Sequence, residues 1–319
     1  MKNYTVLDKG RVTTPCGVFD GVEKLVEYET GEILGLNFNA RNILRTRSGE
    51  FVPFYEQTAR RKNKLAVECH KNGALKAAAL NEPGEVPTPV GALPAELVTF
   101  YDTGELSRVF PRDGAISGYW TEEDERRLYT PLSFDFGFTR FTALVSCVAF
   151  YRSGAVRSVT LFPGELIRVT SPVGDVAVSG GFSLYEDGAL ASCEPSYPVK
   201  IPTPIGVLTA HDPRAAVVSA DSCSLRFNRS GAVSSLRTAR DAVAARLPDG
   251  RVCLRAPAEA PHPSDGDQTV TAAMTVAFGG GVVTIDGESF DIGECDFTVA
   301  PYAARCGGCE SCGDCGGCA

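Results

Sequence analysis

The feature that most constrains the fold of this chain is a glycine turn that recurs along most of its length. In each copy an alternating run ends in an aromatic or similar residue, two residues with a small or acidic member follow, and a glycine precedes a second alternating run. Residue pairs such as Thr-Gly, Asn-Gly and Asp-Gly supply positive φ at low cost, and period-two flanks are typical of paired strands, so each copy predicts a tight hairpin. The six copies, which we call the repeat turns, are LVEYETGEILGL around Gly31, VECHKNGALKAA around Gly73, VTFYDTGELSRV around Gly104, VAFYRSGAVRSV around Gly154, FSLYEDGALASC around Gly188 and LRFNRSGAVSSL around Gly231.

A second motif, which we call the Pro-x-Gly turn, alternates with the first. From its glycine to the next repeat glycine the chain takes 14, 13 and 14 residues (17 to 31, 91 to 104, 174 to 188). From a repeat glycine to the following Pro-x-Gly glycine it takes 18, 20 and 18 residues (73 to 91, 154 to 174, 188 to 206). Two spacings this regular predict a structural unit of about four short antiparallel strands. The copies read TTPCG at 13–17, PTPVG at 87–91, TSPVG at 170–174 and PTPIG at 202–206.

The composition favours a folded, turn-rich chain. Of 319 residues, 44% are hydrophobic and 22% charged, which excludes wholesale disorder, and 33 Gly and 20 Pro favour many short elements. The net charge of −8 argues against nucleic acid as a partner, because phosphate contacts need clustered Lys and Arg. No run reaches 18 uninterrupted apolar residues, and the N-terminus MKNYTVLDKGRV lacks the apolar segment of a secretory signal. We therefore expect no transmembrane segment and a cytoplasmic location.

These patterns predict an all-β protein in three parts. Residues 1–237 form a β-repeat domain whose antiparallel meanders build a solenoid-like sheet, and residues 238–305 form a C-terminal β-meander module. Within that module we expect 257–268 to be a polar, Pro-rich loop, and residues 306–319 form a Gly/Cys-rich tail. Few, short helices are expected. One, TEEDERRLY, has Thr121 as its N-cap and acidic residues at the positive end of its dipole.

The repeat turn, read as FYDTGEL, FYRSGAV and LYEDGAL, resembles the MORN-type repeat, and most closely its divergent bacterial variant. The resemblance covers about residues 20–236 and rests on an aromatic residue, two further residues, a glycine and an alternating run. It implies an elongated twisted sheet with roles in protein contact, scaffolding or membrane-surface association, and it does not imply catalysis. The units depart from the usual simple hairpin because a Pro-x-Gly turn lengthens them. A β-propeller is the alternative architecture, since four strands in roughly 40 residues also describe a blade.

The body of the chain offers no catalytic motif. No GxSxG, GxGxxG, GxxxxGK[ST] or HExxH pattern occurs, and none of the three histidines, His70, His211 and His262, lies in a metal motif. The glycine run 279–281 is expected to be a loop between strands. Five cysteines in apolar or alternating runs are expected to be buried core thiols: Cys147, Cys193, Cys223, Cys253 and Cys295.

Two further groups of residues have both a structural and a functional interpretation. The basic run ARRKNK, from Arg60 to Lys64, is expected to be a solvated connection, the alternative being a contact for an acidic partner or lipid head groups. The repeat tyrosines are expected to pack beside the turn glycines as cross-strand partners, the alternative being a binding stripe. They are Tyr28, Tyr101, Tyr151 and Tyr185.

The C-terminal tail carries the sharpest chemical signal. CGGCESCGDCGGCA is CxxC written four times in overlap, and two thiolates at this spacing can reach one metal ion while glycines let the backbone wrap it. Zinc, copper(I) as a thiolate cluster, and an iron–sulfur cluster all fit the donor set, although the spacing matches the bacterial iron–sulfur run only in part. A redox or disulfide tail and a flexible peptide for a partner or for modification are the alternatives. The predicted metal ligands are Cys306, Cys309, Cys312, Cys315 and Cys318.

Two functions follow from these features. The first is a non-enzymatic binding or scaffold protein, whose repeat sheet offers a surface to a protein partner and whose tail holds metal. The second is a redox, iron–sulfur or sulfur-transfer protein that uses the tail cysteines and docks through the sheet. The first accounts for the absence of catalytic motifs, and the second accounts for the concentration of thiols in one segment.

Overall fold

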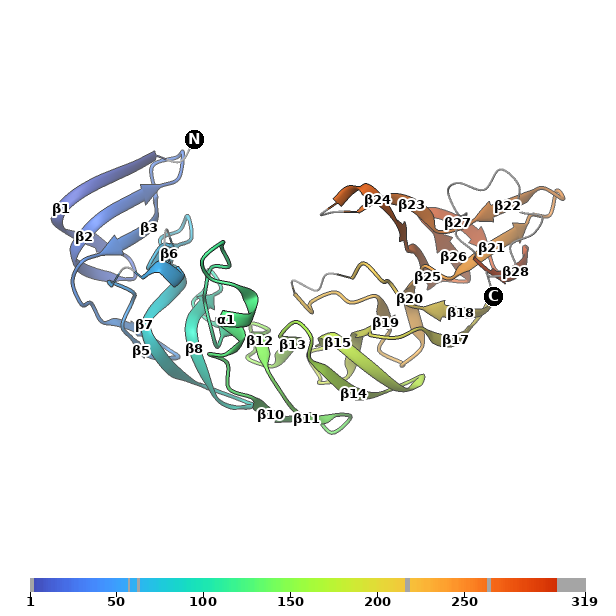
Figure 1. Ribbon diagram of the computed structural model, residues 1–319, viewed down its shortest axis with the longest axis horizontal. Coiled ribbons are helices and arrows are strands. Elements are labelled where there is room, and N and C mark those ends of the chain that lie inside the picture. Colours follow the sequence, from blue (N-terminus) through green and yellow to red (C-terminus); the bar gives the residue numbers. More distant parts are fainter. Residues whose placement is uncertain (1–2, 57, 62–63, 216–218, 263–264, 303–319) are drawn as a thin grey trace. The chain divides into compact units, whose positions relative to one another are not determined.

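A computed structural model describes residues 3–56, 58–61, 64–215, 219–262 and 265–302 (Figure 1). Strands make up 59% of the chain and helices 2%, so the all-β prediction is confirmed. The chain divides into two compact units. The first comprises residues 1–196, 216–223 and 229–231, and the second comprises 197–215, 224–228 and 232–319. This division falls earlier in the chain than the expected boundary after residue 237, because strands 199–203 and 206–210 belong with the C-terminal strands.

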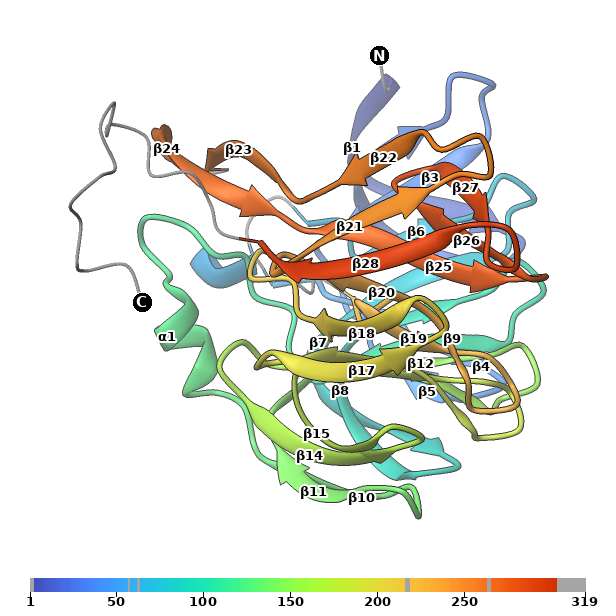
Figure 2. The ribbon, with the colours of Figure 1, turned by 90° about the vertical axis from the view of Figure 1, so that its right-hand side faces the viewer.

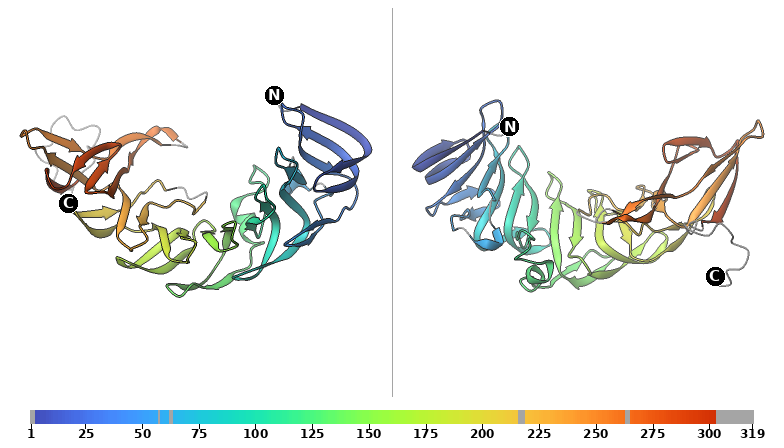
Figure 3. Two further views of the ribbon diagram at one scale, coloured as in Figure 1. Left: turned by 180° about the vertical axis from the view of Figure 1, so that it is seen from behind. Right: turned by 45° about the horizontal axis from the view of Figure 1, so that its top comes forward.

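The first unit is one antiparallel meander in which each strand pairs with the next strand named below (Figure 3). Its members are β1 (Asn3–Thr14), β2 (Gly17–Glu27), β3 (Ile33–Phe38), β6 (Val67–Cys69), β7 (Leu75–Thr88), β8 (Gly91–Phe100), β9 (Leu106–Phe110), β12 (Val145–Phe150), β13 (Val156–Leu161), β15 (Gly174–Leu184) and β16 (Leu190–Pro195). The remaining elements are β14 (Leu166–Ser171) beside β15, the hairpins β4 (Leu44–Thr46)–β5 (Gly49–Phe51) and β10 (Leu132–Asp135)–β11 (Arg140–Ala143), the 3₁₀ turn η1 (Ala59–Arg61), and α1 (Glu122–Arg126).

The second unit consists of antiparallel ribbons. The predicted terminal meander and the hairpin at Pro248–Gly250 are both present, as β25–β26–β27 and β21–β22. The segment 257–268 is not the expected loop, because β23 and β24 pair across it. The strands are β17 (Val199–Thr203) with β18 (Gly206–Ala210); β19 (Leu225–Phe227), β20 (Val233–Thr238), β25 (Met274–Gly279), β26 (Val282–Ile285) and β27 (Glu288–Asp291); β22 (Val252–Arg255), β21 (Asp241–Arg246) and β28 (Asp296–Pro301); and β23 (Ala258–His262) with β24 (Asp265–Ala272).

The repeat turns are the predicted hairpin turns, and they share one hydrogen-bond pattern. At Tyr101 the backbone N–H donates to Glu105 O (2.8 Å), and the N–H of Gly104 donates back to Tyr101 O (2.9 Å). The same two bonds form at Tyr28, His70, Tyr151 and Tyr185. The five glycines have φ between +80° and +94°, and the strand register shifts beside each turn. This is a type I turn followed by a glycine in the left-handed region that forms a β-bulge. A residue with a side chain would strain the backbone at this positive φ.

The Pro-x-Gly turns are built by a hydroxyl. Thr88 Oγ1 donates to Gly91 O (2.6 Å) and accepts from the N–H of Val90 (3.3 Å), which closes a two-residue loop. Ser171 and Thr203 make the same pair of bonds, and Thr14 bonds to Gly17 O (3.0 Å). The hydroxyl before proline therefore stabilises the turn with its hydrogen bonds, and the proline ring fixes φ at the next position.

The units between repeat turns differ in strand number, from the predicted four (β16, β17, β18 and β19 between Gly188 and Gly231) down to two. Residues 75–100 contain two long strands, β7 and β8, whose pairing slips between Ala79 and Gly84 at the sequence NEPG. In a later copy the bend divides the first strand into β13 and β14, which both pair with β15. Adjacent units in the first compact unit also share one hydrogen-bonded sheet, as β9 does with β12. Propeller blades are separate sheets, so this meander is not built as a propeller.

Successive repeats are joined by the side chains of their aromatic positions. Tyr28 Oη donates to Cys69 O (2.9 Å), Tyr101 Oη to Phe150 O (2.7 Å) and Tyr151 Oη to Leu184 O (2.7 Å). His70 occupies the same position, and its Nε2 lies 3.0 Å from Phe100 O. A carbonyl can only accept, so Nε2 carries the proton. In every case the acceptor is the residue directly before the aromatic position of the next repeat. The bonds therefore form a ladder that joins successive repeat turns at the ends of their strands.

Cations reinforce this aromatic ladder from the following repeat. Arg152 lies 4.5 Å above the Tyr101 ring and pairs with Asp102 at 2.7 Å, while Arg229 lies 4.7 Å above the Tyr185 ring. Lys71 lies 5.5 Å above the Tyr28 ring. The tyrosines thus touch the next repeat as well as their own turn, and the hydroxyls of Tyr28, Tyr101 and Tyr151 are bonded within the fold. The alternative of a free binding stripe does not fit these contacts.

The ladder makes a prediction about stability. In Tyr101→Phe the carbonyl of the buried Phe150 loses its donor, and the free energy of unfolding should fall by about 1–2 kcal/mol. Urea unfolding followed by circular dichroism measures this change. Tyr119→Phe is the control, because the Tyr119 side chain is 96% exposed. Equal stability of the two variants would contradict the role of the ladder.

Candidate functional site

The predicted metal ligands lie outside the described residues. Cys306, Cys309, Cys312, Cys315 and Cys318 all fall in 303–319, so the metal-binding tail stays a prediction. Within the described ranges no three His, Cys, Asp or Glu side chains gather in a way that could hold a metal ion. No helix in the same ranges has the length and apolarity needed to cross a membrane.

The histidines take up different positions. His70 is a member of the aromatic ladder. His211 is half-buried beside Thr238, its buried Nδ1 has no partner among the described residues, and burial together with nearby Arg240 lowers its pKa. The side chain of His262 lies outside the described part. The glycines at 279–281 form the tight turn between β25 and β26, as expected.

The basic run from Arg60 to Lys64 is not the solvated connection that its composition suggested. The Arg60 and Arg61 side chains are only 15% and 5% exposed. Arg60 donates to Glu125 (2.7 and 2.5 Å) and to Glu96 (2.7 Å), while Arg61 lies 3.4 Å from Asp113. Carboxylates of the same chain therefore neutralise Arg60 and Arg61, which the sequence could not show because they lie 36 to 65 residues away.

This ion cluster fastens the inserted helix to the sheet. The helix begins after Thr121, which caps it as predicted, with Asp124 completing the capping box. Its buried Glu125 also accepts from Trp120 Nε1 (2.6 Å) and from the N–H of Gly114 (3.0 Å). Burial alone would raise the pKa of Glu96 and of Glu125, but the hydrogen bonds and charge of Arg60 outweigh it and hold both below the usual range.

The cluster predicts a pH-dependent loss of stability. Because both glutamate pKa values are lowered by folding, their contribution is present above about pH 4.3 and disappears as the pH falls through the folded values. Arg60→Gln should cost about 3–5 kcal/mol at pH 7, because the buried Glu125 loses its cation and Glu96 keeps only Arg112. The cost should shrink as the pH falls toward 3.5, because carboxylates that have lost Arg60 bind protons more readily. Melts from pH 3 to 7 test this, with Arg45→Gln, from an exposed pair with Glu50, as a control that should change little.

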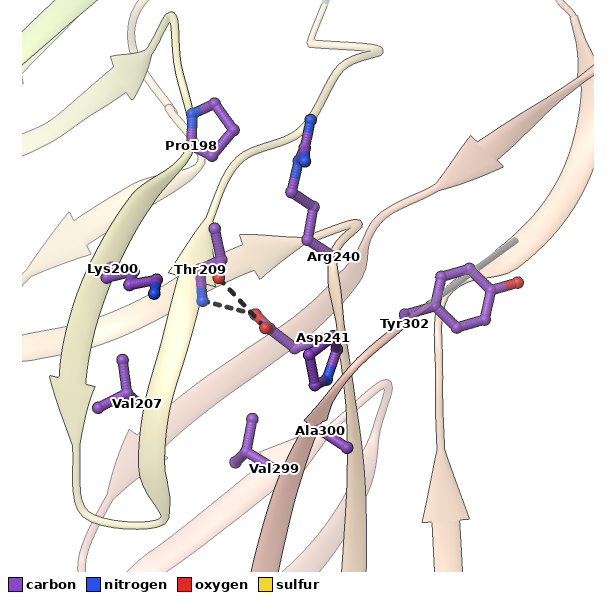
Figure 4. A pocket seen from close by; sticks show the side chains of 10 residues that line it. Pro198, Lys200, Val207, Thr209, Arg240, Asp241, Val299, Ala300 and Tyr302 are labelled. Carbon is purple, nitrogen blue, oxygen red and sulfur yellow. Dashed lines mark hydrogen bonds between the residues drawn. The ribbon is translucent and has the colours of Figure 1, made fainter. Parts of the chain in front are cut away.

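The second unit contains a groove on its surface (Figure 4). It has a volume of about 630 Å³ and lies where the β17–β18 hairpin meets the ends of β21 and β28; Figure 2 shows these strands side by side. We call it the cationic groove. Its lining residues are Pro198, Lys200, Val207, Thr209, Arg240, Asp241, Val299, Ala300, Pro301 and Tyr302.

Asp241 builds the groove and is not a free acid within it. Its buried carboxylate accepts from the N–H of Thr209 (2.5 Å), from Thr209 Oγ1 (3.2 Å) and from Thr238 Oγ1 (2.7 Å). These bonds tie β18 to the start of β21. At the hairpin tip Gly206, with φ +121°, lets the chain approach β28 closely, since a Cβ there would lie 3.2 Å from Val299 Cγ2. The PTPIG turn thus positions the outer wall of the groove.

The surface of the groove combines positive charge with apolar contact. Lys200 and Arg240 are exposed, and no carboxylate of the described chain pairs with either side chain. Figure 4 places Thr209 between them, and Val207, 52% exposed, lies on the same hairpin. Such a surface can hold a carboxylate next to an apolar side chain. Sequence reasoning missed it, because only the PTPIG turn was visible and Arg240 and Tyr302 are distant in the chain.

Comparison of the chain with family models, with curated proteins and with solved structures found no match. The similarity to MORN-type repeats therefore rests on the repeat-turn motif itself.

Proposed function

We propose that this is a non-enzymatic binding or scaffold protein that holds an acidic segment of a partner protein in the cationic groove and a soft metal ion in its cysteine-rich tail. The observation that carries the first part is the pair of exposed cations, Lys200 and Arg240, which no carboxylate among the described residues neutralises, beside exposed apolar side chains. Asp241, the one acidic group in the lining, is fully engaged in the frame. The groove can therefore bind an acidic group through its cations and an apolar group through its exposed apolar side chains.

A protein segment is the ligand class that fits best. The groove runs along the hairpin, and its apolar side chains come from two places in the chain: Val207 from β18, and Val299 and Tyr302 from β28 and the residue after it. An extended peptide that alternates acidic and apolar residues can meet both kinds of contact at once, because its side chains project with a period of two. The overall charge of −8 does not oppose this, since the field near the groove is set by the nearby cations.

The groove is tested with a fluorescent nine-residue peptide that alternates glutamate and valine. The double variant Lys200→Glu, Arg240→Glu should weaken binding at least tenfold, and binding by the wild type should weaken with salt. The control double variant Arg168→Glu, Arg246→Glu makes the same charge change at exposed positions outside the groove and should bind within about twofold of wild type. Absence of binding by the wild type, or equal loss in both variants, would contradict the groove assignment.

The metal-binding part of the proposal rests on the five tail thiols, which suit soft ions, and on the expected cytoplasmic location, where thiols stay reduced. Deleting 306–319 should abolish most metal binding and leave the apo melting temperature nearly unchanged, because the last described strand ends at Pro301. Elemental analysis of anaerobically purified protein measures the first effect. Unchanged metal content in the truncated protein would contradict the tail assignment.

The same preparation separates the two functions. Zinc or copper(I) in a colourless protein supports the binding protein. A brown protein with visible absorbance, lost on truncation, supports the alternative of an iron–sulfur or redox protein that uses the tail cysteines.

A further inference from the structure

Two cysteines far apart in the sequence meet in the first compact unit. Cys16 lies in the Pro-x-Gly turn between β1 and β2, and Cys69 is the last residue of β6. Their Sγ atoms are 3.9 Å apart across 53 residues of sequence. Cys16 is partly exposed, whereas Cys69 is 1% exposed.

The contact follows from how the turns pack. Pro15 of the first Pro-x-Gly turn lies on the repeat turn at Gly73, where an added Cβ would be 2.4 Å from Pro15 Cγ. The hydrogen bond from Tyr28 Oη to Cys69 O holds β6 in register with the same hairpin. A second copy of this packing exists, because Pro172 lies against Gly231 in the same way. The place where the sulfurs meet is thus part of the repeat architecture.

The repeats themselves show that cysteine is unusual at both positions. Where Cys16 stands, the other Pro-x-Gly turns have an aliphatic residue: Val90, Val173 and Ile205. Where Cys69 stands, directly before the aromatic position, the four later repeats have a large apolar residue: Phe100, Phe150, Leu184 and Phe227. The two positions that carry cysteine in place of the repeat residue are the two that touch.

The surroundings give the two thiols different roles. Thr14 Oγ1 lies 3.1 Å from Cys16 Sγ, and the hydrogen bond shared with Cys69 lowers the pKa of Cys16 while the pKa of Cys69 rises. Cys16 is therefore the thiol that solvent reaches and that ionises first, with Cys69 directly behind it. An accessible attacking thiol backed by a buried resolving thiol is the arrangement of redox-sensitive pairs.

We propose that Cys16 and Cys69 form a reversible redox switch that a low-molecular-weight disulfide oxidises. The Cys16 thiolate attacks one sulfur of the disulfide RSSR, which forms Cys16–S–SR and releases RS⁻. The Cys69 thiol then loses its proton and attacks Cys16 Sγ, which forms the Cys16–Cys69 bond and releases the second RS⁻. In balance, two protein thiols and RSSR give one protein disulfide and two RSH. The sulfurs need to approach by about 2 Å, which side-chain rotation can supply.

The disulfide would staple the first hairpin to the next repeat and close a loop of 53 residues. By restricting the unfolded chain it should raise the melting temperature of the first unit by roughly 5–10 °C. The switch therefore sets the rigidity of the N-terminal repeats according to the thiol–disulfide balance around the protein.

The test treats the full-length protein with glutathione disulfide and maps its disulfides by mass spectrometry after non-reducing digestion. We expect a Cys16–Cys69 peptide pair, a raised melting temperature, and reversal of both by dithiothreitol. In the Cys69→Ser variant the reaction should stop at the mixed disulfide between Cys16 and glutathione. Cys16→Val, which restores the residue of the other turns and should fold, leaves Cys69 unmodified.

Cys147→Ser is the matched control, because the Cys147 thiol is buried and burial raises its pKa to about 11. This variant should form the Cys16–Cys69 bond as wild type does. Pairing of Cys16 with a tail cysteine, absence of any bond at Cys16 and Cys69, or a bond that leaves the melting temperature unchanged would overturn the proposal.

Discussion

The hydrogen bond from the aromatic position of one repeat to a backbone carbonyl of the next is the contact on which the first compact unit depends. Strand pairing sets the distance between neighbouring hairpins, as β9 with β12. The bonds of Tyr28, Tyr101 and Tyr151, with His70 in the same role, add a side-chain link at each step, and they satisfy carbonyls where a bulge interrupts the strand ladder. A cation above the ring adds a second link at three of the steps. The repeat turn thus forms a hairpin and also attaches it to its neighbour.

The residues that could react or bind a partner lie where the chain departs from this repeat pattern. Cysteines replace aliphatic and aromatic residues at two touching positions, Cys16 and Cys69. In the second unit the last Pro-x-Gly turn packs against β28, with Asp241 as the tie, and opens the cationic groove beside Lys200 and Arg240. The inserted helix is fastened by a buried ion cluster around Arg60. The repeat fold tolerates these departures because each repeat has its own turn and its own hydrogen bond to the next repeat.

Local features were predictable and distant pairings were not. The repeat turn at Gly104, the Pro-x-Gly turn at Thr88 and the cap at Thr121 all appear where expected, because each depends on a few consecutive residues. Between Gly73 and Gly104 the expected four short strands are two bent ones, since NEPG shifts the register of β7 and β8 without ending the strands. Arg60 was expected in solvent, and it is buried because Glu96 and Glu125 arrive from other strands and the helix. Of the groove, only its hairpin turn could be recognised.

By itself, the sequence determined the all-β class, the turn positions and the alternation that makes strands, because positive φ, proline geometry and period-two burial are properties of short segments. It also determined that five thiols share the tail. Only the tertiary structure decided which distant groups meet: the sulfurs of Cys16 and Cys69, the carboxylates that neutralise Arg60, and the two cations of the groove, Lys200 and Arg240. Charge pairing and thiol reactivity act over a few ångströms in space, and the bends and bulges that set those distances accumulate along the whole chain.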